Sequence, residues 1–87
     1  MGFKTKIEKG ILYKDDYKLL NEEYRERIEK SVKSSTVYKL KWNDLTDLKA
    51  IYQKYYPKDF SMNLNCGKCL MRMLTKLQGM IRTYENQ

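Results

Sequence analysis

Apolar side chains recur every three or four residues in three stretches of the chain, and this is the spacing of one face of an α-helix. The first stretch, about residues 15–33, has the apolar positions Tyr17, Leu20, Tyr24 and Ile28. The second, about residues 43–56, has Leu45, Leu48, Ile51, Tyr52 and Tyr55. The third, about residues 65–84, has Cys66, Leu70, Met73, Leu77, Met80 and Tyr84, in alternating steps of four and three. We therefore predict three amphipathic helices, of which the third carries a seam like that of a coiled coil.

Residues that commonly begin or end helices stand at the boundaries of these stretches. Short polar side chains are found where each stretch begins, and they are suited to accept hydrogen bonds from the first free N–H groups of a helix. They are Asp15 or Asp16, Asn43 or Asp44, and Asn65. Pro57 follows the second stretch and should end that helix, because the residue before a proline is pushed out of helical geometry.

Two shorter segments alternate with a period of two, which is the pattern of a half-buried strand. One face of the segment near 3–8 has Phe3, Thr5 and Ile7, and one face of the segment near 36–42 has Tyr38, Leu40 and Trp42. We predict that both are short β or extended segments. A chain of 87 residues can build one modest core. The predicted fold is therefore a single, mainly α domain over residues 1–87, a small three-helix bundle.

The chain is strongly basic, with 18 Lys and Arg against 11 Asp and Glu and a net charge of +7. Such a balance favours nucleic acid, an anionic membrane surface or an acidic protein as partner, although it also suits a domain whose charge only maintains solubility. No acid occurs between Asp59 and Glu85, so the polar face of the third helix has one sign of charge. Its basic residues are Lys68, Arg72, Lys76 and Arg82. We predict that this face binds nucleic acid, with Lys39 and Lys41 as a second basic strip.

Eight tyrosines are interspersed with the lysines, and Tyr38, Tyr55 and Tyr56 are close to lysines in the sequence. Exposed tyrosine rings stack on the bases of single-stranded nucleic acid. Tyrosines at helical spacing also serve as core residues whose hydroxyl reaches the surface. The sequence leaves both roles open.

The groups that most enzymes use for acid–base or nucleophilic chemistry are missing. The chain has no histidine, and its four glycines form neither a phosphate-binding loop nor a dinucleotide fingerprint. Its carboxylates fall in helix caps or in mixed-charge helix faces rather than beside a nucleophile. We therefore predict that the protein is not an enzyme and has no small-molecule substrate.

Cys66 and Cys69 are three positions apart, so they are neighbours on one face of the third predicted helix. A structural zinc ion needs four ligands, and two such pairs would supply them only if two protomers shared the metal. A redox role is typical of Cys-x-x-Cys after a strand, whereas a polar loop precedes this pair. Free cysteines are also among the most buried residues. We predict that the pair belongs to a core or self-association seam and holds no cofactor, with the shared zinc and the redox role as alternatives.

The first ten residues contain no apolar segment of the kind found in secretory signals, and no stretch approaches the roughly 20 apolar residues that span a bilayer. Binding flat on a membrane surface favours Trp or Phe beside the apolar face of a helix. The only tryptophan, Trp42, lies outside the third predicted helix. We predict an intracellular, cytoplasmic protein without a membrane partner.

The segment DLKAIYQKYYPKDFSMNLNCGKCLMRMLTKL combines an L-x-x-I-Y helix, a short loop, N-C-x-x-C, and a closing helix with Met-Leu and a further Leu. Over about residues 45–78 the chain resembles small proteins encoded by phages and mobile elements of gut Bacteroidetes. This resemblance implies a role in phage assembly, DNA handling or interference with host defence. It also implies a location in the host cytoplasm or in a virion.

We predict a non-enzymatic, small basic binding module that contacts nucleic acid through the basic face of the third helix. We expect it to associate with itself or to join a larger assembly. The alternative is a virion structural or anti-defence protein that acts purely by protein contact, which requires an exposed apolar patch. The candidate residues for that patch are Phe60, Met62, Leu64 and Met80.

Overall fold

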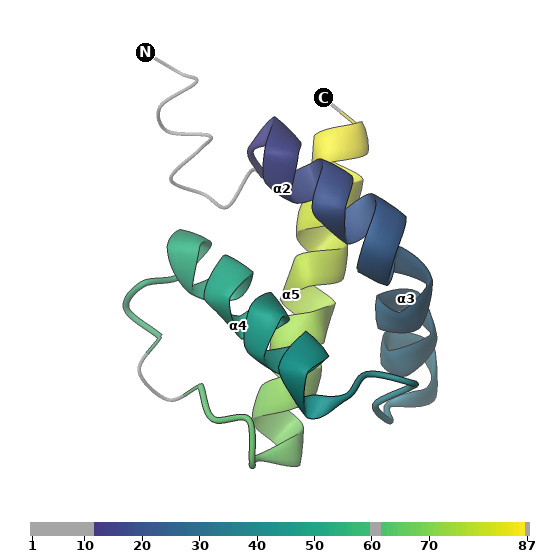
Figure 1. Cartoon of the computed structure of the whole chain (residues 1–87), viewed down its shortest axis with the longest axis vertical. Helices are drawn as coiled ribbons and strands as arrows, with labels where there is room; N and C mark the ends of the chain where they lie inside the picture. The colour runs from purple at the N-terminus through teal and green to yellow at the C-terminus, as the bar shows by residue number, and fades with distance from the viewer. Residues whose placement is uncertain (1–11, 60–61, 87) are drawn as a thin grey trace.

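The three predicted helical stretches are present in the computed structural model, which describes residues 12–59 and 62–86. Figure 1 shows α2 (Lys14–Leu19), η1 (Leu20–Tyr24) and α3 (Arg25–Ser34), followed by α4 (Trp42–Tyr55) and α5 (Gly67–Glu85). The described residues contain no strand. The fold is thus mainly helical, as predicted, and the helices are joined by two irregular connections.

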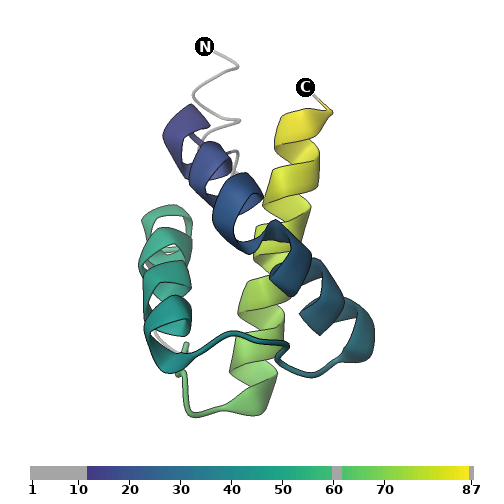
Figure 2. The same cartoon turned by 45° about the vertical axis from the view of Figure 1, so that its right-hand side comes forward.

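The first helical stretch consists of α2, η1 and α3, which run into one another without a break (Figure 2). The η1 segment is one wider π-helical turn, a feature usually found as an insertion in an α-helix. The stretch ends at Ser35, whose φ of 58° is left-handed. The N–H groups of Ser35 and Thr36 donate to the carbonyls of Val32 and Ser31. These bonds satisfy carbonyl groups that a helix C-terminus otherwise leaves free.

The helix starts differ from the predicted ones by one to three positions. The predicted caps were Asp15 or Asp16, Asn43 or Asp44, and Asn65. The observed N-cap residues are Tyr13 for α2, Lys41 for α4 and Cys66 for α5. Asp44 still stabilises the start of α4, because its Oδ2 accepts a hydrogen bond from the Lys41 N–H at 3.0 Å. The end of α4 is confirmed, since this helix stops at Tyr55, just before Pro57.

The segment 36–42 was predicted to be a short β or extended segment, but it forms no strand: residues 36–41 are an irregular connection between α3 and α4, and Trp42 begins α4. The Tyr38 N–H donates to the Ser31 hydroxyl of α3 at 2.8 Å rather than to a neighbouring strand. Lys39 has a φ of 51°, a left-handed conformation that interrupts the geometry of a strand. The other predicted segment, 3–8, lies outside the described residues.

The core is built around α5, which packs against both α3 and α4 (Figure 1). At the C-terminal end of α5, Tyr84 stacks on Tyr17 of α2 with ring centroids 4.1 Å apart. The side of α5 that faces the core is the predicted heptad-like seam from Leu70 to Met80. The fully buried apolar residues are Leu20, Ile28, Leu48, Tyr52, Met73, Leu74, Leu77 and Ile81. Burial of all three apolar stripes on one another is the main source of stability in a domain of this size.

Candidate nucleic-acid interface

The structure divides the predicted basic face of α5 between two sides of the helix. Lys76 lies on the side of the α4–α5 loop, where its Nζ is 4.5 Å from the centre of the Tyr56 ring. Arg72 is on the same side and contacts Asp59 at 3.2 Å. Arg82 is on the other side, where it lines a surface hollow shared with α3. The four cations of α5 therefore do not present one continuous surface to a ligand.

Arg72 is engaged within the fold. Its Nη2 is 3.2 Å from Asp59 Oδ2, and the same carboxylate accepts a hydrogen bond from the Tyr52 hydroxyl. Burial, and then this hydrogen bond to Asp59, raises the pKa of Tyr52 to about 12. The three side chains fasten α4, the α4–α5 loop and α5 to one another. The contacts of Arg72 thus suit a residue that holds the fold together.

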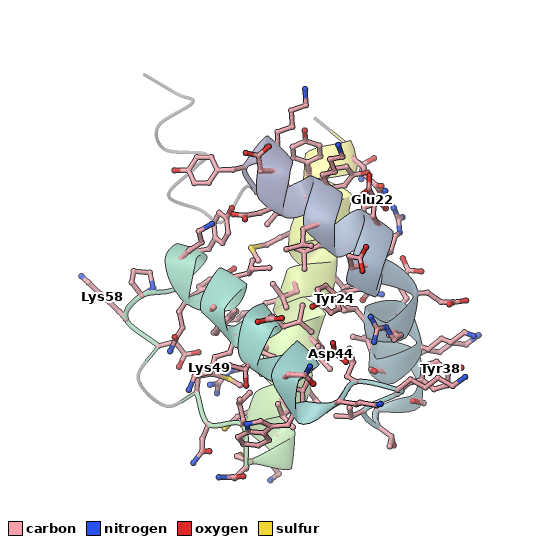
Figure 3. The ribbon with its side chains drawn as sticks, viewed as in Figure 1. Glu22, Tyr24, Tyr38, Asp44, Lys49 and Lys58 are labelled. Carbon is pink, nitrogen blue, oxygen red and sulfur yellow. The ribbon has the colours of Figure 1, made fainter. Side chains whose placement is uncertain are left out.

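Residues 30–43 form a second stretch without acids, and it carries Lys30, Lys33, Lys39 and Lys41. This stretch runs from the second half of α3 through the connection to the first two residues of α4, and Figure 3 labels Tyr38 on the connection. The Nζ atoms of Lys30 and Lys39 lie 5.0 and 5.3 Å from the centre of the Tyr38 ring. Trp42, the first residue of α4, is 59% exposed. The connection and the residues on either side of it therefore present lysines interleaved with two aromatic side chains.

A groove of about 620 Å³ lies between this connection and the first turns of α5. Its lining residues are Ser35, Thr36 and Val37 on the connection, and Gly67, Lys68 and Met71 on α5. In Figures 1 and 2 both segments lie at the same end of the molecule. The groove thus joins the two acid-free stretches of the chain. We call the groove, together with Lys39, Lys41 and Lys68, the basic end.

The lysines of the basic end are not engaged in ion pairs within the described part of the fold. None of the described residues forms an ion pair with Lys39, Lys41 or Lys68. The ion pairs elsewhere are Arg25 with Glu29 and Glu85, Arg27 with Asp44, Lys30 with Glu26, Lys54 with Asp16, and Arg72 with Asp59. The N-terminus of α5 adds the positive end of a helix dipole, which favours an anion.

Cys66 and Cys69 are free thiols at the start of α5, and both are half-buried. Cys66 is the N-cap of this helix, and its Sγ accepts a hydrogen bond from the Cys69 N–H at 3.3 Å. Cys69 packs against the edge of the core, so the predicted core position fits Cys69, whereas Cys66 serves as a helix cap. Within the described part of the chain, no three His, Cys, Asp or Glu side chains come together as a metal site. A zinc ion shared between protomers stays a prediction.

The predicted apolar patch is wrong for two of its four residues, Met62 and Met80, which are only 6% and 4% exposed. Met80 lies on the core side of α5, and Met62 packs into the core from the α4–α5 loop. Leu64 is half-buried against the same core, and Phe60 lies outside the described residues. The large apolar side chains that are exposed in the described residues are Tyr13, Leu19 and Trp42.

Comparisons with protein-family models, with curated proteins and with solved structures found no match to this chain. The resemblance of residues 45–78 to phage and mobile-element proteins therefore stays a prediction. Over the described residues, no helix combines the length and the apolar character that crossing a membrane requires. The functional proposal therefore rests on the basic end. The α3–α4 connection, which carries Lys39 and Lys41, could have been found in the sequence as part of the acid-free run of residues 30–43.

Proposed function

We propose that the protein is a non-enzymatic module that binds single-stranded nucleic acid at the basic end. The observation that carries this proposal is the meeting of two acid-free stretches at one groove, with Lys39 and Lys41 on one stretch and Lys68 on the other. A phosphate backbone is the natural partner of a surface with this charge. The proposal keeps the predicted partner and moves the contact from the whole face of α5 to its N-terminal end.

The aromatic side chains of Tyr38 and Trp42 favour a single strand over a duplex. Trp42 is the largest exposed apolar side chain in the described residues, and two lysine side chains lie near the ring of Tyr38. Unpaired bases offer their faces to such rings, and stacking contributes about 1–3 kcal/mol per base. In a duplex those faces are covered by neighbouring base pairs. We therefore expect the lysines to hold phosphates while Trp42 stacks on a base.

A direct test uses fluorescence anisotropy of a labelled oligothymidylate with the wild-type protein and two triple variants. The first variant carries Lys39→Gln, Lys41→Gln and Lys68→Gln. The matched control carries Lys14→Gln, Lys18→Gln and Lys58→Gln, which remove three exposed lysines. Lys14 and Lys18 belong to α2, which Figure 1 places at the other end of the molecule, and Figure 3 labels Lys58 on the α4–α5 loop, away from the basic end. Both variants lower the net charge from +7 to +4 by the removal of three lysines.

The proposal predicts that the first variant weakens binding at least about tenfold more than the control does, because about three phosphate contacts are lost. It also predicts that Trp42 fluorescence is quenched by the single strand and much less by a duplex of the same length. Equal losses in the two triple variants would show that net charge alone attracts the oligonucleotide. That result would contradict a site at the basic end.

The alternative is action purely by protein contact in a virion or against host defence. In the described residues, its exposed apolar anchors would be Tyr13 and Leu19 near α2 and Trp42 at the start of α4. Figure 1 places α2 and the start of α4 at opposite ends of the molecule. These residues form no common patch, so this alternative rests on less than the basic end does. Absence of oligonucleotide binding even at low salt would favour it.

A further inference from the structure

The pair of thiols at the start of α5 is not used by the proposed function, although it borders the same groove. Gly67 and Lys68, the two residues between the cysteines, line that groove. We propose that Cys66 and Cys69 form a redox-active dithiol, in which Cys66 attacks a disulfide and Cys69 completes the exchange. This inference does not depend on nucleic-acid binding, because it rests on the geometry of the thiols alone.

The backbone places the two sulfur atoms in different surroundings. Cys66 is the N-cap with extended backbone angles, φ −104° and ψ 115°. Its Sγ therefore lies against the free N–H groups of the first turn and accepts the Cys69 N–H at 3.3 Å. Cys69 lies inside the first turn and packs on the edge of the core. Sulfur at an N-cap is the position in which a helix best stabilises a thiolate.

The pKa values of the two thiols are shifted in opposite directions, as expected for an attacking thiol and a second thiol that completes the exchange. The pKa of Cys66 is lowered, first by a side-chain hydrogen bond with Cys69 and then by the Cys69 N–H, with a smaller effect of the Arg72 charge. The pKa of Cys69 is raised, first by the same hydrogen bond and then by burial. The pKa of the Cys66 thiol thus lies below that of the Cys69 thiol, so Cys66 loses its proton first.

A disulfide has access to Cys66. Both thiols are half-buried rather than enclosed. A Cβ atom added to Gly67 would meet nothing within 4 Å, so the space over the turn between the cysteines is open. The groove beside it is lined by Val37 and Met71 as well as by small and polar residues, and Lys68 is exposed at its edge. This surface admits a disulfide that carries carboxylates.

The exchange is a two-step reaction with a disulfide RS–SR as the oxidant. The Cys66 thiolate attacks one sulfur, so that a Cys66–SR bond forms, the RS–SR bond breaks, and RS⁻ leaves and takes a proton from water. The Cys69 thiol then gives its proton to solvent and attacks the Cys66 sulfur. The Cys66–Cys69 disulfide forms, and the second RS⁻ leaves and is protonated. The dithiol is oxidised by two electrons, and one disulfide is reduced to two thiols.

The test follows the reaction of the full chain with oxidised glutathione by intact-mass spectrometry. The proteins compared are the wild type, Cys66→Ser and Cys69→Ser. We expect the wild type to lose two hydrogens without keeping an adduct. We expect Cys69→Ser to accumulate one glutathione on Cys66, at least tenfold faster than Cys66→Ser accumulates one on Cys69. In urea that difference should vanish, because it comes from the folded helix start.

Two results would overturn the inference. One is equal adduct formation by Cys66→Ser and Cys69→Ser while far-UV circular dichroism shows both variants to be folded. The other is a wild-type protein that keeps glutathione on its cysteines and forms no internal disulfide. Serine is itself a good N-cap, so Cys66→Ser is expected to keep α5 and to make the comparison meaningful.

Discussion

The hydroxyl of Tyr55 is predicted to be one of the most important polar groups for the stability of the fold. Tyr55 is at the end of α4, where this helix meets the start of α2. Its hydroxyl accepts a hydrogen bond from the Tyr13 N–H at 3.0 Å and donates one to the carboxylate of Asp16. Lys54 Nζ lies 3.0 Å from both oxygens of that carboxylate. Tyr55 and Asp16 are each only 8% exposed, so water cannot readily replace these partners.

The variant Tyr55→Phe removes the hydroxyl and keeps the ring in the core. A hydrogen bond to a charged group contributes about 1.5–3 kcal/mol, and an amide that loses its partner adds a smaller cost. Asp16 keeps its contact with Lys54, whereas the Tyr13 N–H loses its partner. We therefore expect a loss of about 2–3 kcal/mol. For a domain of this size such a loss lowers Tm by about 10–20 °C.

Urea denaturation followed by far-UV circular dichroism measures this effect. Tyr56→Phe is the matched control, because the structure gives the Tyr56 hydroxyl no hydrogen bond with any described residue, while its ring lies below Lys76. We expect the control to change stability by less than about 0.5 kcal/mol. If Tyr55→Phe and Tyr56→Phe have the same unfolding midpoint, the hydrogen bonds of the Tyr55 hydroxyl between α2 and α4 do not stabilise the fold.

Three further predictions concern the core and the α3–α4 connection. The folded state holds the pKa of Tyr52 at about 12, above the value of about 10 in an unfolded chain. The Tyr52 hydroxyl therefore contributes fully to the free energy of unfolding below about pH 10, and this contribution is lost as the pH rises toward about 12. Urea melts between about pH 10 and 12 should show the free energy of unfolding falling with pH, and Tyr52→Phe should make this fall less steep. Met80→Ala should cost about 2–5 kcal/mol because the side chain is buried, whereas Met71→Ala, at a half-buried position, should cost clearly less in the same melts. Ser31→Ala removes the acceptor of the Tyr38 N–H, so amide hydrogen exchange of Tyr38 should become much faster, and unchanged protection would contradict the role given to Ser31.

The helices were predictable because the spacing of apolar residues is dictated by burial on one side of each helix. The seam of α5 from Leu70 to Met80 shows this directly, since its residues are the buried ones. The starts were less predictable, because capping depends on tertiary contacts. Asp16, a good cap by composition, is instead buried against Lys54 and Tyr55 of α4. The period-two pattern of 36–42 was misleading for the same reason, since Ser31 of α3 supplies the partner of this segment.

The candidate site was only half visible in the sequence. Arg82 follows Lys76 by six residues, which is about one and two-thirds turns of a helix, so the two cannot share one narrow face, and the structure separates them. The absence of acids in residues 30–43 was a usable signal for the α3–α4 connection. That this connection meets the start of α5 could not be read from the sequence, because the contact joins segments about 30 residues apart through the packing of α3 on α5.

The salt dependence of oligothymidylate binding measures directly whether the three lysines of the basic end neutralise phosphates. If Lys39, Lys41 and Lys68 neutralise three phosphates, a plot of log K against log salt for the wild type has a slope of about −2 from these contacts, since each phosphate of a single strand contributes about −0.7. We expect the variant with all three lysines replaced by Gln to lose about 2 units of this slope, and the Lys14, Lys18 and Lys58 control to keep it. A slope that is the same in both triple variants would contradict binding at the basic end.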